Sequence, residues 1–356
     1  MPNTPEHTEQ GWRYPIDSNR HHRENGWDYC GHAIYHITLV VAERQHLFGE
    51  LIGIGSSADT AQIELNSFGL QVHRLLRDTP KYYQQKGYAL KMLAFKIMPD
   101  HLHFVIQVLD RLPKPIGTVV RGFKSACTSL FKHTYLGGDD TTEMHNHTAT
   151  IPPVILHFVR IFADTGSIWE KTPAGYHERI LHAQGQLHNM ISYVKDNPRR
   201  LWLKKKRPEY FAVQRNVQWN GHCFSAVGNL WLLDSHLCAV HVRSHFTEND
   251  ARNYMNDCII AARKGAVLVG AFISQKEKKV FEVAINEGLS VVYLLPYGIS
   301  EYYKPIGNLM EPCAQGKMLF LTEASAETSP RKSITREECN HLNAIAEELM
   351  QISMMN

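Results

Sequence analysis

The sequence lacks the features that mark several common classes of protein. Its seven cysteines are scattered and form no Cys-x-x-Cys pair, which argues against a zinc finger or a disulfide framework and for reduced thiols in the cytoplasm. No apolar run reaches the roughly 18 residues that a membrane-spanning helix needs. The N-terminal residues include no apolar stretch of the kind found in secretory signals. We therefore expect a cytoplasmic protein that does not enter a membrane.

Familiar catalytic signatures are also missing. The sequence has no G-x-S-x-G, no H-E-x-x-H, no P-loop lysine and no paired-carboxylate signature. Residues 53–58, G-I-G-S-S-A, mimic a dinucleotide fingerprint, but Asp59 and Thr60 indicate a turn into another short strand instead of a helix. The net charge of +3 indicates no particular partner, and the length of 356 residues predicts about two domains.

The most informative stretch is residues 91–109, which reads as a strand, a tight turn at residues 98–100 and a second strand. His101 and His103 open the second strand two residues apart, so both imidazoles point to the same face. Four apolar residues fill the opposite face: Leu102, Phe104, Ile106 and Val108. Two neutral imidazoles on one strand are a good start for a divalent metal site.

The alternative is that these histidines are ordinary solvated strand residues. The chain has 21 histidines, so an H-x-H can arise by chance, and His145 and His147 form a second one in a polar run that reads as a loop. A third ligand and a nucleophile elsewhere in the chain would favour the metal site.

Residues 185–197 supply both, on a predicted helix. Its apolar stripe is Leu187, Met190, Ile191 and Val194. Tyr193 and Asn197 are four residues apart and share a flank of that helix, and Pro198 is predicted to end it. An amide oxygen one turn from a phenol could complete a site of two histidines and one asparagine. His177 and Glu178 precede this helix and are either further ligands or a surface pair.

The motifs P-D-H-L-H-F-V-I and Y-V-K-D-N-P-R-R-L, in this order with amphipathic helix between them, resemble the single-tyrosine HUH transposases, in particular the REP-associated branch. The resemblance covers roughly residues 28–235. It implies metal-dependent cleavage and transfer of single-stranded or stem-loop DNA, with Tyr193 forming a 5′-phosphotyrosine. His101, His103 and Asn197 would hold Mg²⁺ or Mn²⁺, and both a monomer and a homodimer stay open.

Residues 195–207 carry seven cations in thirteen residues, beside the proposed nucleophile. Trp202 within them offers a stacking surface for an unpaired base, so we expect nucleic-acid contact here. The cations are Lys195, Arg199, Arg200, Lys204, Lys205, Lys206 and Arg207. Arg121 and Lys124 decorate a predicted helix at 115–135 that is either a phosphate-facing helix beside the site or a solvated basic face.

The predicted order of elements is strand, helix, strand, strand, helix, strand, helix, with residues 154–162 and 167–169 among the strands. This order fits an α+β fold, a ferredoxin-like antiparallel sheet with helices on one face. Residues 1–27 are predicted to be a flexible tail and residues 28–245 the HUH domain.

Residues 246–356 alternate helices with continuous apolar strands, which predicts a small α/β, Rossmann-like domain with a parallel sheet. The domain loosely resembles that of DprA-type DNA-processing proteins. In place of a glycine-rich phosphate loop it has A-F-I-S-Q at 271–275, so a nucleotide site is not favoured. Ser274, Gln275, Lys276 and Lys279 lie where such folds bind ligands, and a scaffold or strand-binding role fits equally.

Three other functions remain open from the sequence. The chain could be a domesticated protein that recognises hairpin DNA without cutting it. It could be a metal nuclease that uses water, with Tyr193 structural. It could also be a nucleotide-sensing module driven by its C-terminal domain. A covalent adduct with DNA that depends on Tyr193 would distinguish the transposase-type reaction from all three.

Overall fold

The computed structural model of the chain forms two compact units, Met1–Trp202 and Leu203–Asn356. It describes all residues except 1–5, 9–10, 14–15, 18–22, 25, 56, 137–152, 172–174, 220, 302, 306, 324, 327–333 and 354–356. The second H-x-H, at residues 145–147, lies outside the described residues. Within the predicted tail the described residues form short paired strands: β1 Glu6–Thr8, β2 Gly11–Arg13, β3 Ile16–Asp17 and β4 Arg23–Glu24.

The first unit is built on a four-stranded sheet in the order β10-β5-β9-β8, in which every neighbouring pair is antiparallel. Its strands are β5 Ala33–Val40, β8 Leu90–Ile97, β9 His101–Val108 and β10 His177–Ile180. Numbered along the chain, the strand order is fourth, first, third, second, with helices between first and second and between third and fourth. The predicted ferredoxin-like α+β fold is confirmed.

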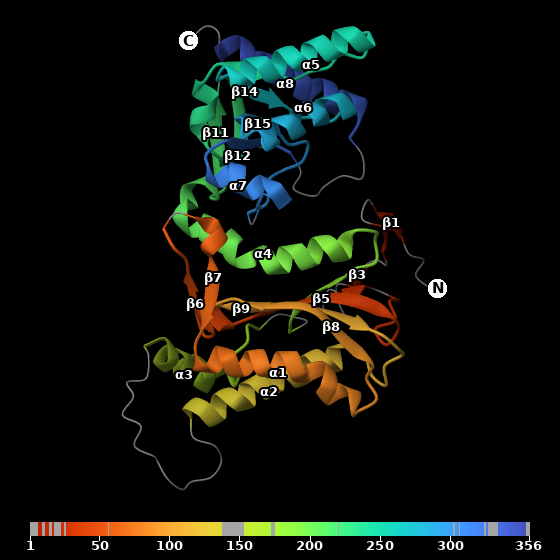
Figure 1. The fold of residues 1–356 in the computed structure, drawn as a ribbon, viewed down its shortest axis with the longest axis vertical. Coiled ribbons are helices and arrows are strands. Elements are labelled where there is room, and N and C mark those ends of the chain that lie inside the picture. Colours follow the sequence, from red (N-terminus) through yellow and green to blue (C-terminus); the bar gives the residue numbers. More distant parts are fainter. Residues whose placement is uncertain are drawn as a thin grey trace. The chain divides into compact units, whose positions relative to one another are not determined.

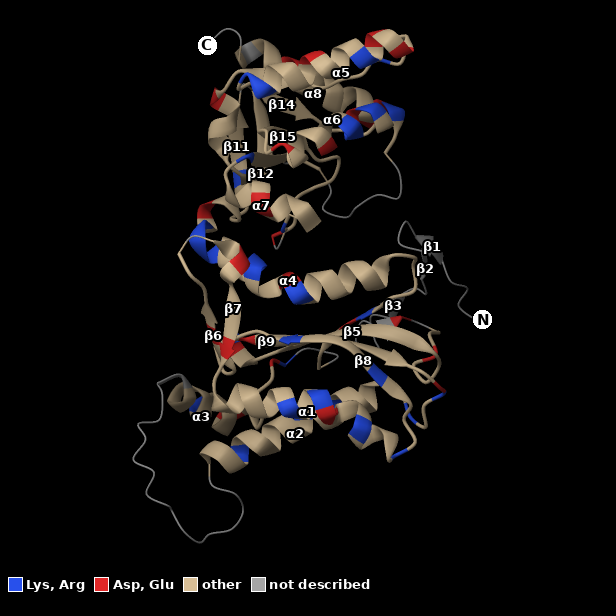
Figure 2. Cartoon of the chain, in the orientation of Figure 1, with Lys and Arg blue, Asp and Glu red and all other residues tan. Residues whose placement is uncertain are grey.

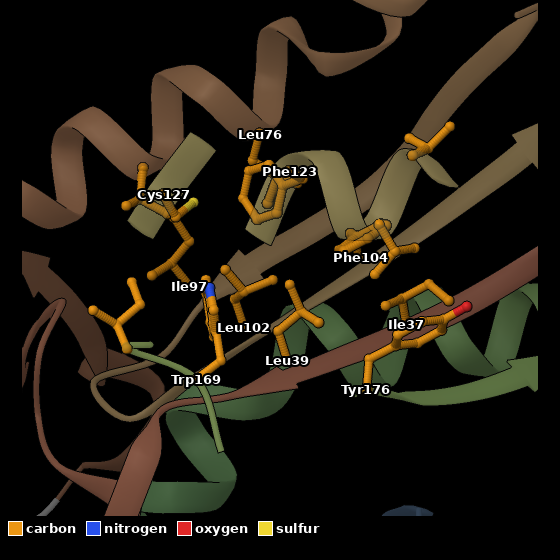
Figure 3. Close-up of a cluster of buried hydrophobic side chains, with 14 of the residues drawn as sticks. Ile37, Leu39, Leu76, Ile97, Leu102, Phe104, Phe123, Cys127, Trp169 and Tyr176 are labelled. Atoms are coloured by element: carbon orange, nitrogen blue, oxygen red, sulfur yellow. The ribbon is translucent and has the colours of Figure 1, made fainter. Parts of the chain in front are cut away.

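Two amphipathic helices cover one face of this sheet (Figure 1): α1 Ser67–Gln84 and α2 Gly117–Tyr135. The side chain of Asn66 caps α1 by accepting the N–H of Gly69 at 2.8 Å. Leu76 and Phe123 on these helices meet Ile37 and Leu102 of the sheet in a continuous apolar core (Figure 3). The alternation of β5 and β9 therefore puts one set of side chains into this core and the other set onto the opposite face.

One predicted strand is wrong. Residues 154–162 belong to a helix, α3 Pro153–Thr165, and Trp169 makes only an isolated bridge to Val41. The β-branched run favoured a strand, but Ile155, Phe158 and Phe162 are three and four residues apart. That helical spacing buries all three in the core, and tertiary packing overrides the local preference.

Helix α4, Gln186–Lys206, packs on the other face of the sheet. Its Val194 is fully buried against Val105 of β9 and Leu181. The predicted end at Pro198 is wrong, because the helix continues through the proline for two further turns. A proline inside a helix costs roughly 3 kcal/mol; here burial of the residues that follow, such as Leu203 at 7% exposure, offsets that cost.

The glycine-rich segment at 53–58 lies between two antiparallel strands, β6 Gly49–Ile52 and β7 Gln62–Leu65. A short 3-10 turn, Ala58–Thr60, leads into β7. The predicted turn into another short strand is confirmed, and the segment has no βαβ context for a dinucleotide.

The second unit holds a six-stranded sheet in the order β11-β12-β16-β15-β14-β13. The last four strands in this order are parallel and alternate with helices. The sequence predicted three of them and left residues 237–239 outside the domain. The strands are β11 Gln214–Trp219, β12 His222–Gly228, β13 Leu237–Ala239, β14 Val267–Gly270, β15 Val291–Leu294 and β16 Met318–Glu323. The helices are α5 Glu248–Arg263, α6 Gln275–Asn286, α7 Met310–Ala314 and α8 Arg336–Ser353.

The division between the units lies between Trp202 and Leu203, whereas the sequence placed the domain boundary at 245–246. The reason is that β12 pairs with β16, from Phe224 opposite Glu323 to Gly228 opposite Leu319. This antiparallel pairing carries the β11–β12 hairpin into the sheet of the second unit.

Among the described helices, none combines the length and apolar character that crossing a bilayer requires.

The core of the first unit generates a stability prediction. Leu76→Ala should lower the free energy of unfolding by about 2–5 kcal/mol, because Leu76 is fully buried between α1 and the sheet. Leu70→Ala, on the same helix but 49% exposed, should change it by about 0.5 kcal/mol or less. Urea denaturation of both variants checks this, and equal losses would contradict the assignment of the core face.

Candidate active site

The strand pairing gathers histidines from two strands on the sheet face that α4 covers. β5 lies beside β9 with Thr38 opposite His103 and Val40 opposite His101. Because side chains alternate, His36 and Thr38 share this face with both histidines of β9. Tyr193 of α4 lies over it. His36, His101, His103 and Tyr193 are called the imidazole–tyrosine cluster below.

Both histidines of the predicted metal pair are held at Nδ1. Nδ1 of His103 lies 2.9 Å from Oγ1 of Thr38 and 3.2 Å from Nε2 of His36. Nδ1 of His101 donates to the Asp100 carboxylate at 2.5 Å. The two rings lie edge to face with centroids 4.8 Å apart. Each imidazole is thus oriented through Nδ1 by a neighbouring polar group, an arrangement typical of histidines that ligate through Nε2.

Tyr193 lies against these rings. Its ring centroid is 5.6 Å from that of His103 and 6.3 Å from that of His36, both edge to face. The guanidinium carbon of Arg200 lies 5.4 Å from the centre of the Tyr193 ring. Tyr193 is also 37% exposed, so a partly exposed side chain lies beside the buried His103 and the half-buried His36.

Asn197 lies one turn after Tyr193 and is 8% exposed. Its Nδ2 donates to the backbone carbonyl of Tyr193 at 3.0 Å, so the amide is held to its own helix and its Oδ1 is turned away from that bond. No group of three or more His, Cys, Asp or Glu side chains in the described part of the chain is arranged to hold a metal ion. The predicted metal ligands, His101, His103 and Asn197, are two imidazoles and one amide, and so are not a group of this kind.

Sequence reasoning missed four polar residues on this face: His36, Thr38, Lys96 and Arg179. Burial and the nearby charge of Arg179 lower the pKa of His36 to about 4, so this ring is neutral at neutral pH. Lys96 on β8 pairs opposite His103, and burial lowers its pKa. His177 is opposite Thr38 and shares the face, whereas Glu178 is opposite Ile37 and points to the other one. The period-two pattern of residues 33–40 could have indicated His36 and Thr38.

The basic residues of α4 differ in their surroundings, although Lys and Arg recur along its C-terminal half (Figure 2). Arg199 pairs with Asp196 at 2.6 Å. Lys195, Lys205 and Lys206 are exposed, and Lys204 is partly so. Trp202 is packed against Gly53, where an added Cβ would lie 2.7 Å from the indole ring. Gly53 therefore occupies part of the indole surface, and the stacking role of Trp202 stays a prediction.

Arg121 and Lys124 do not lie beside the imidazole–tyrosine cluster. They belong to α2, which covers the opposite face of the sheet. The ammonium of Lys124 donates to the backbone carbonyl of Gly175, and burial lowers its pKa. The interpretation of this helix as a phosphate-facing element beside the site is therefore wrong, because the sheet separates the two.

No protein-family model and no curated protein matches the sequence. Among solved structures, the chain is similar to a REP-associated tyrosine transposase bound to a REP hairpin, with 12% identity and a TM-score of 0.28 over 49% of this chain and 72% of that chain. It is also similar to a candidate transposase from Deinococcus radiodurans R1, with 14% identity and a TM-score of 0.26 over 49% of this chain and 96% of that chain. Such TM-scores establish no shared function, which must be argued from the side chains.

Lys96 generates a prediction about stability and pH. Its pKa is lower in the folded chain than its ordinary value of 10.5, so the unfolded chain binds more protons between the two pKa values and stability rises with pH in that window. Lys96→Met should therefore stabilise the protein at pH 7 by about 0.5 kcal/mol. The gain should shrink as the pH rises toward 10.5.

Urea denaturation across this pH range checks the prediction. Lys91→Met on the same strand is the matched control, because Lys91 is exposed, and it should show no such pH-dependent gain. A gain that is the same at every pH would show that the added packing of methionine, and not the buried charge, is responsible.

Proposed function

We propose that this chain cleaves single-stranded or hairpin DNA and transfers the cut end through a covalent bond between Tyr193 and a DNA phosphate. The observation that carries the proposal is the position of an accessible phenol, 37% exposed, with its ring 5.6 Å from that of the buried His103. A nucleophile beside a pair of oriented imidazoles is the arrangement that metal-assisted phosphoryl transfer needs.

His101, His103 and Asn197 fit a divalent ion by their donor chemistry. Asp100 and Thr38 engage the Nδ1 atoms of the two histidines, so each ring would ligate through Nε2, and Asn197 would add its amide oxygen. Bound Mg²⁺ or Mn²⁺ would neutralise charge on a non-bridging phosphate oxygen and orient the phosphate for in-line attack. Imidazole nitrogen suits Mn²⁺ better than Mg²⁺.

In the proposed reaction the phenol oxygen of Tyr193 forms a bond to phosphorus while the bond from phosphorus to the 3′-oxygen breaks. The phenol loses its proton to solvent, and the departing 3′-oxygen takes a proton from solvent. A 3′-hydroxyl from the same or another strand reverses the step, so the phosphotyrosine conserves the energy of the phosphodiester. Arg200 keeps a cation 5.4 Å from the phenol ring, where negative charge develops.

The exposed cations on α4 support a nucleic-acid substrate. Lys195 is exposed on the same helix as Tyr193, on the other flank because side chains two residues apart diverge, so it is available to a phosphate backbone that crosses the helix. An unpaired or looped strand can bring its phosphate to a partly buried phenol more readily than a stacked duplex can. Because a scissile phosphate must reach the cluster from solvent, single-stranded or stem-loop DNA is the substrate class we propose.

Tyr193→Phe should abolish covalent attachment to stem-loop DNA in the presence of Mn²⁺, because it removes the only atom that bonds to phosphorus. Tyr82→Phe is the matched control: Tyr82 is 54% exposed on α1 and should leave adduct formation unchanged. Denaturing electrophoresis of labelled oligonucleotides measures both the adduct and the free cleavage product.

The same assay separates the alternatives. Cleavage that survives Tyr193→Phe and leaves no protein-linked product would indicate a nuclease that uses water. Binding without cleavage on a panel of stem-loops from the flanking genome would indicate a DNA-binding protein that does not cut.

Thr38→Val should weaken Mn²⁺ binding by about 10- to 100-fold, because the Thr38 hydroxyl orients the His103 ring through Nδ1. Adduct formation should recover at high Mn²⁺ concentration, since Tyr193 is unchanged. Titration calorimetry with Mn²⁺ measures the affinity. Thr79→Val, which removes a hydroxyl bonded to Leu75 in α1, is the control and should bind Mn²⁺ normally.

A further inference from the structure

The second unit carries an open groove of about 440 Å³ between the 3-10 turn Pro208–Tyr210, the β11–β12 hairpin and the 3-10 helix Leu230–Asp234. All of its lining residues belong to this unit, whereas the imidazole–tyrosine cluster belongs to the first. Three aromatic and three amide side chains characterise it: Tyr210, Trp219, Trp231, Gln214, Gln218 and Asn229. These six residues are called the aromatic groove below.

Trp231 is the most unusual residue of the groove, because its side chain is 78% exposed although its backbone is well anchored. The backbone N–H of Trp231 donates to Oδ1 of Asn229 at 3.2 Å, and Nδ2 of Asn229 donates to the backbone carbonyl of Gly316 at 2.9 Å. The next two residues, Leu232 and Leu233, are buried in the core of the unit. A large aromatic ring is thus held out to solvent on a fixed turn, which is characteristic of binding surfaces.

The other two aromatic residues are supported from behind. The guanidinium of Arg207 stacks 4.2 Å from the centre of the Tyr210 ring, and Arg207 pairs with Glu209 at 2.6 Å. Trp219 is partly buried against the core of the unit. These contacts limit the movement of Tyr210 and Trp219, which lowers the ordering cost when a flat ring inserts between the aromatic side chains.

The charged residues that line the groove are two carboxylates, and the cations lie in the segment that borders it. Residues 204–215 include five cations and one carboxylate, and that carboxylate, Glu209, is engaged by Arg207. The other carboxylate on the groove is the exposed Asp234. The neutral amides of Gln214 and Gln218 lie among the aromatic side chains, where they can donate to and accept from the edge of a base.

We propose that the aromatic groove binds unpaired bases of single-stranded DNA, with Trp231 as the stacking platform and the lysines of residues 204–206 along the phosphates. Stacking on aromatic faces beside a basic segment is how proteins hold single strands without reading a duplex. The choice of DNA over RNA rests on the proposed function, whereas the choice of an unpaired strand rests on the groove. The sequence placed this stacking role on Trp202, which belongs to the first unit and packs against Gly53.

The test measures equilibrium binding by the full chain, in a Tyr193→Phe background with metal ions chelated, so that no covalent chemistry contributes. The probe is a fluorescein-labelled oligothymidylate of about ten nucleotides, within the usual site size of a single-strand-binding fold. Trp231→Ala should weaken binding roughly 5- to 100-fold, the range for loss of one stacked base. Trp231→Phe, which keeps a ring, should recover most of the affinity.

Ile260→Ala on α5 is the control for loss of an exposed apolar side chain, since Ile260 is 44% exposed and lies outside the groove. It should bind like the parent protein. Because Trp231 is exposed, Trp231→Ala should keep the parent's urea denaturation midpoint, which verifies that the variant is folded.

Four outcomes would overturn the proposal. Two concern Trp231→Ala: an affinity for oligothymidylate equal to that of the parent protein, or an equal loss of affinity for a duplex of the same length. Two concern the parent protein: binding of an abasic strand as tightly as oligothymidylate, or tighter binding of oligouridylate. Loss of self-association in Trp231→Ala without loss of DNA binding would assign the groove to a second copy of the chain instead. The adduct assay at Tyr193 is independent of this measurement. Its failure would remove the reason for choosing DNA over RNA but leave base binding at the groove standing, and failure at the groove would leave the reaction at Tyr193 standing.

Discussion

The pairing of β5 with β9 is the interaction on which the candidate site depends. It places Thr38 opposite His103 and brings His36 to the same face, while Ile37 and Leu102 enter the core on the other face. Because side chains alternate, a slip of one residue in this pairing would carry one set of imidazoles into the core. The register that buries the apolar residues is therefore also the register that assembles the site.

The second constraint is that α4 must pack on this face and still leave part of Tyr193 exposed to solvent. Burial of Val194 against Val105 fixes the rotation of the helix, and Tyr193, one residue earlier, then lies at the edge of the contact with 37% of its surface exposed. The amide of Asn197 is fixed by its bond to the carbonyl of Tyr193. One buried valine thus determines where both polar residues of the helix lie, and stability and geometry depend on the same contact.

Much of this arrangement was predictable because it depends on local periodicity. The period of two placed His101 and His103 on one face, and the helical spacing of four placed Tyr193 and Asn197 on one flank. The alternation of residues 33–40 could have placed His36 on a polar face, but no local pattern specifies which strands pair, so its position beside His103 was missed. Long-range packing likewise decided three other features that the sequence did not predict. These are helix α3, the continuation of α4 through Pro198, and the pairing of the β11–β12 hairpin with the sheet of the second unit.

In the second unit, a carboxylate of the chain itself occupies the start of α6. The carboxylate of Glu277 accepts the backbone N–H groups of Val242, Ile273 and Ser274 at 3.0–3.1 Å, beyond the ends of β13 and β14. Backbone N–H groups at the start of a helix, such as those of Ile273 and Ser274, are of the kind that can bind phosphate. The parallel strands also follow one another in a single direction along the sheet, so their order provides no switch point where a crevice would open. A nucleotide-sensing role would need Glu277 to be displaced from three hydrogen bonds, whereas strand binding at the aromatic groove needs no such rearrangement.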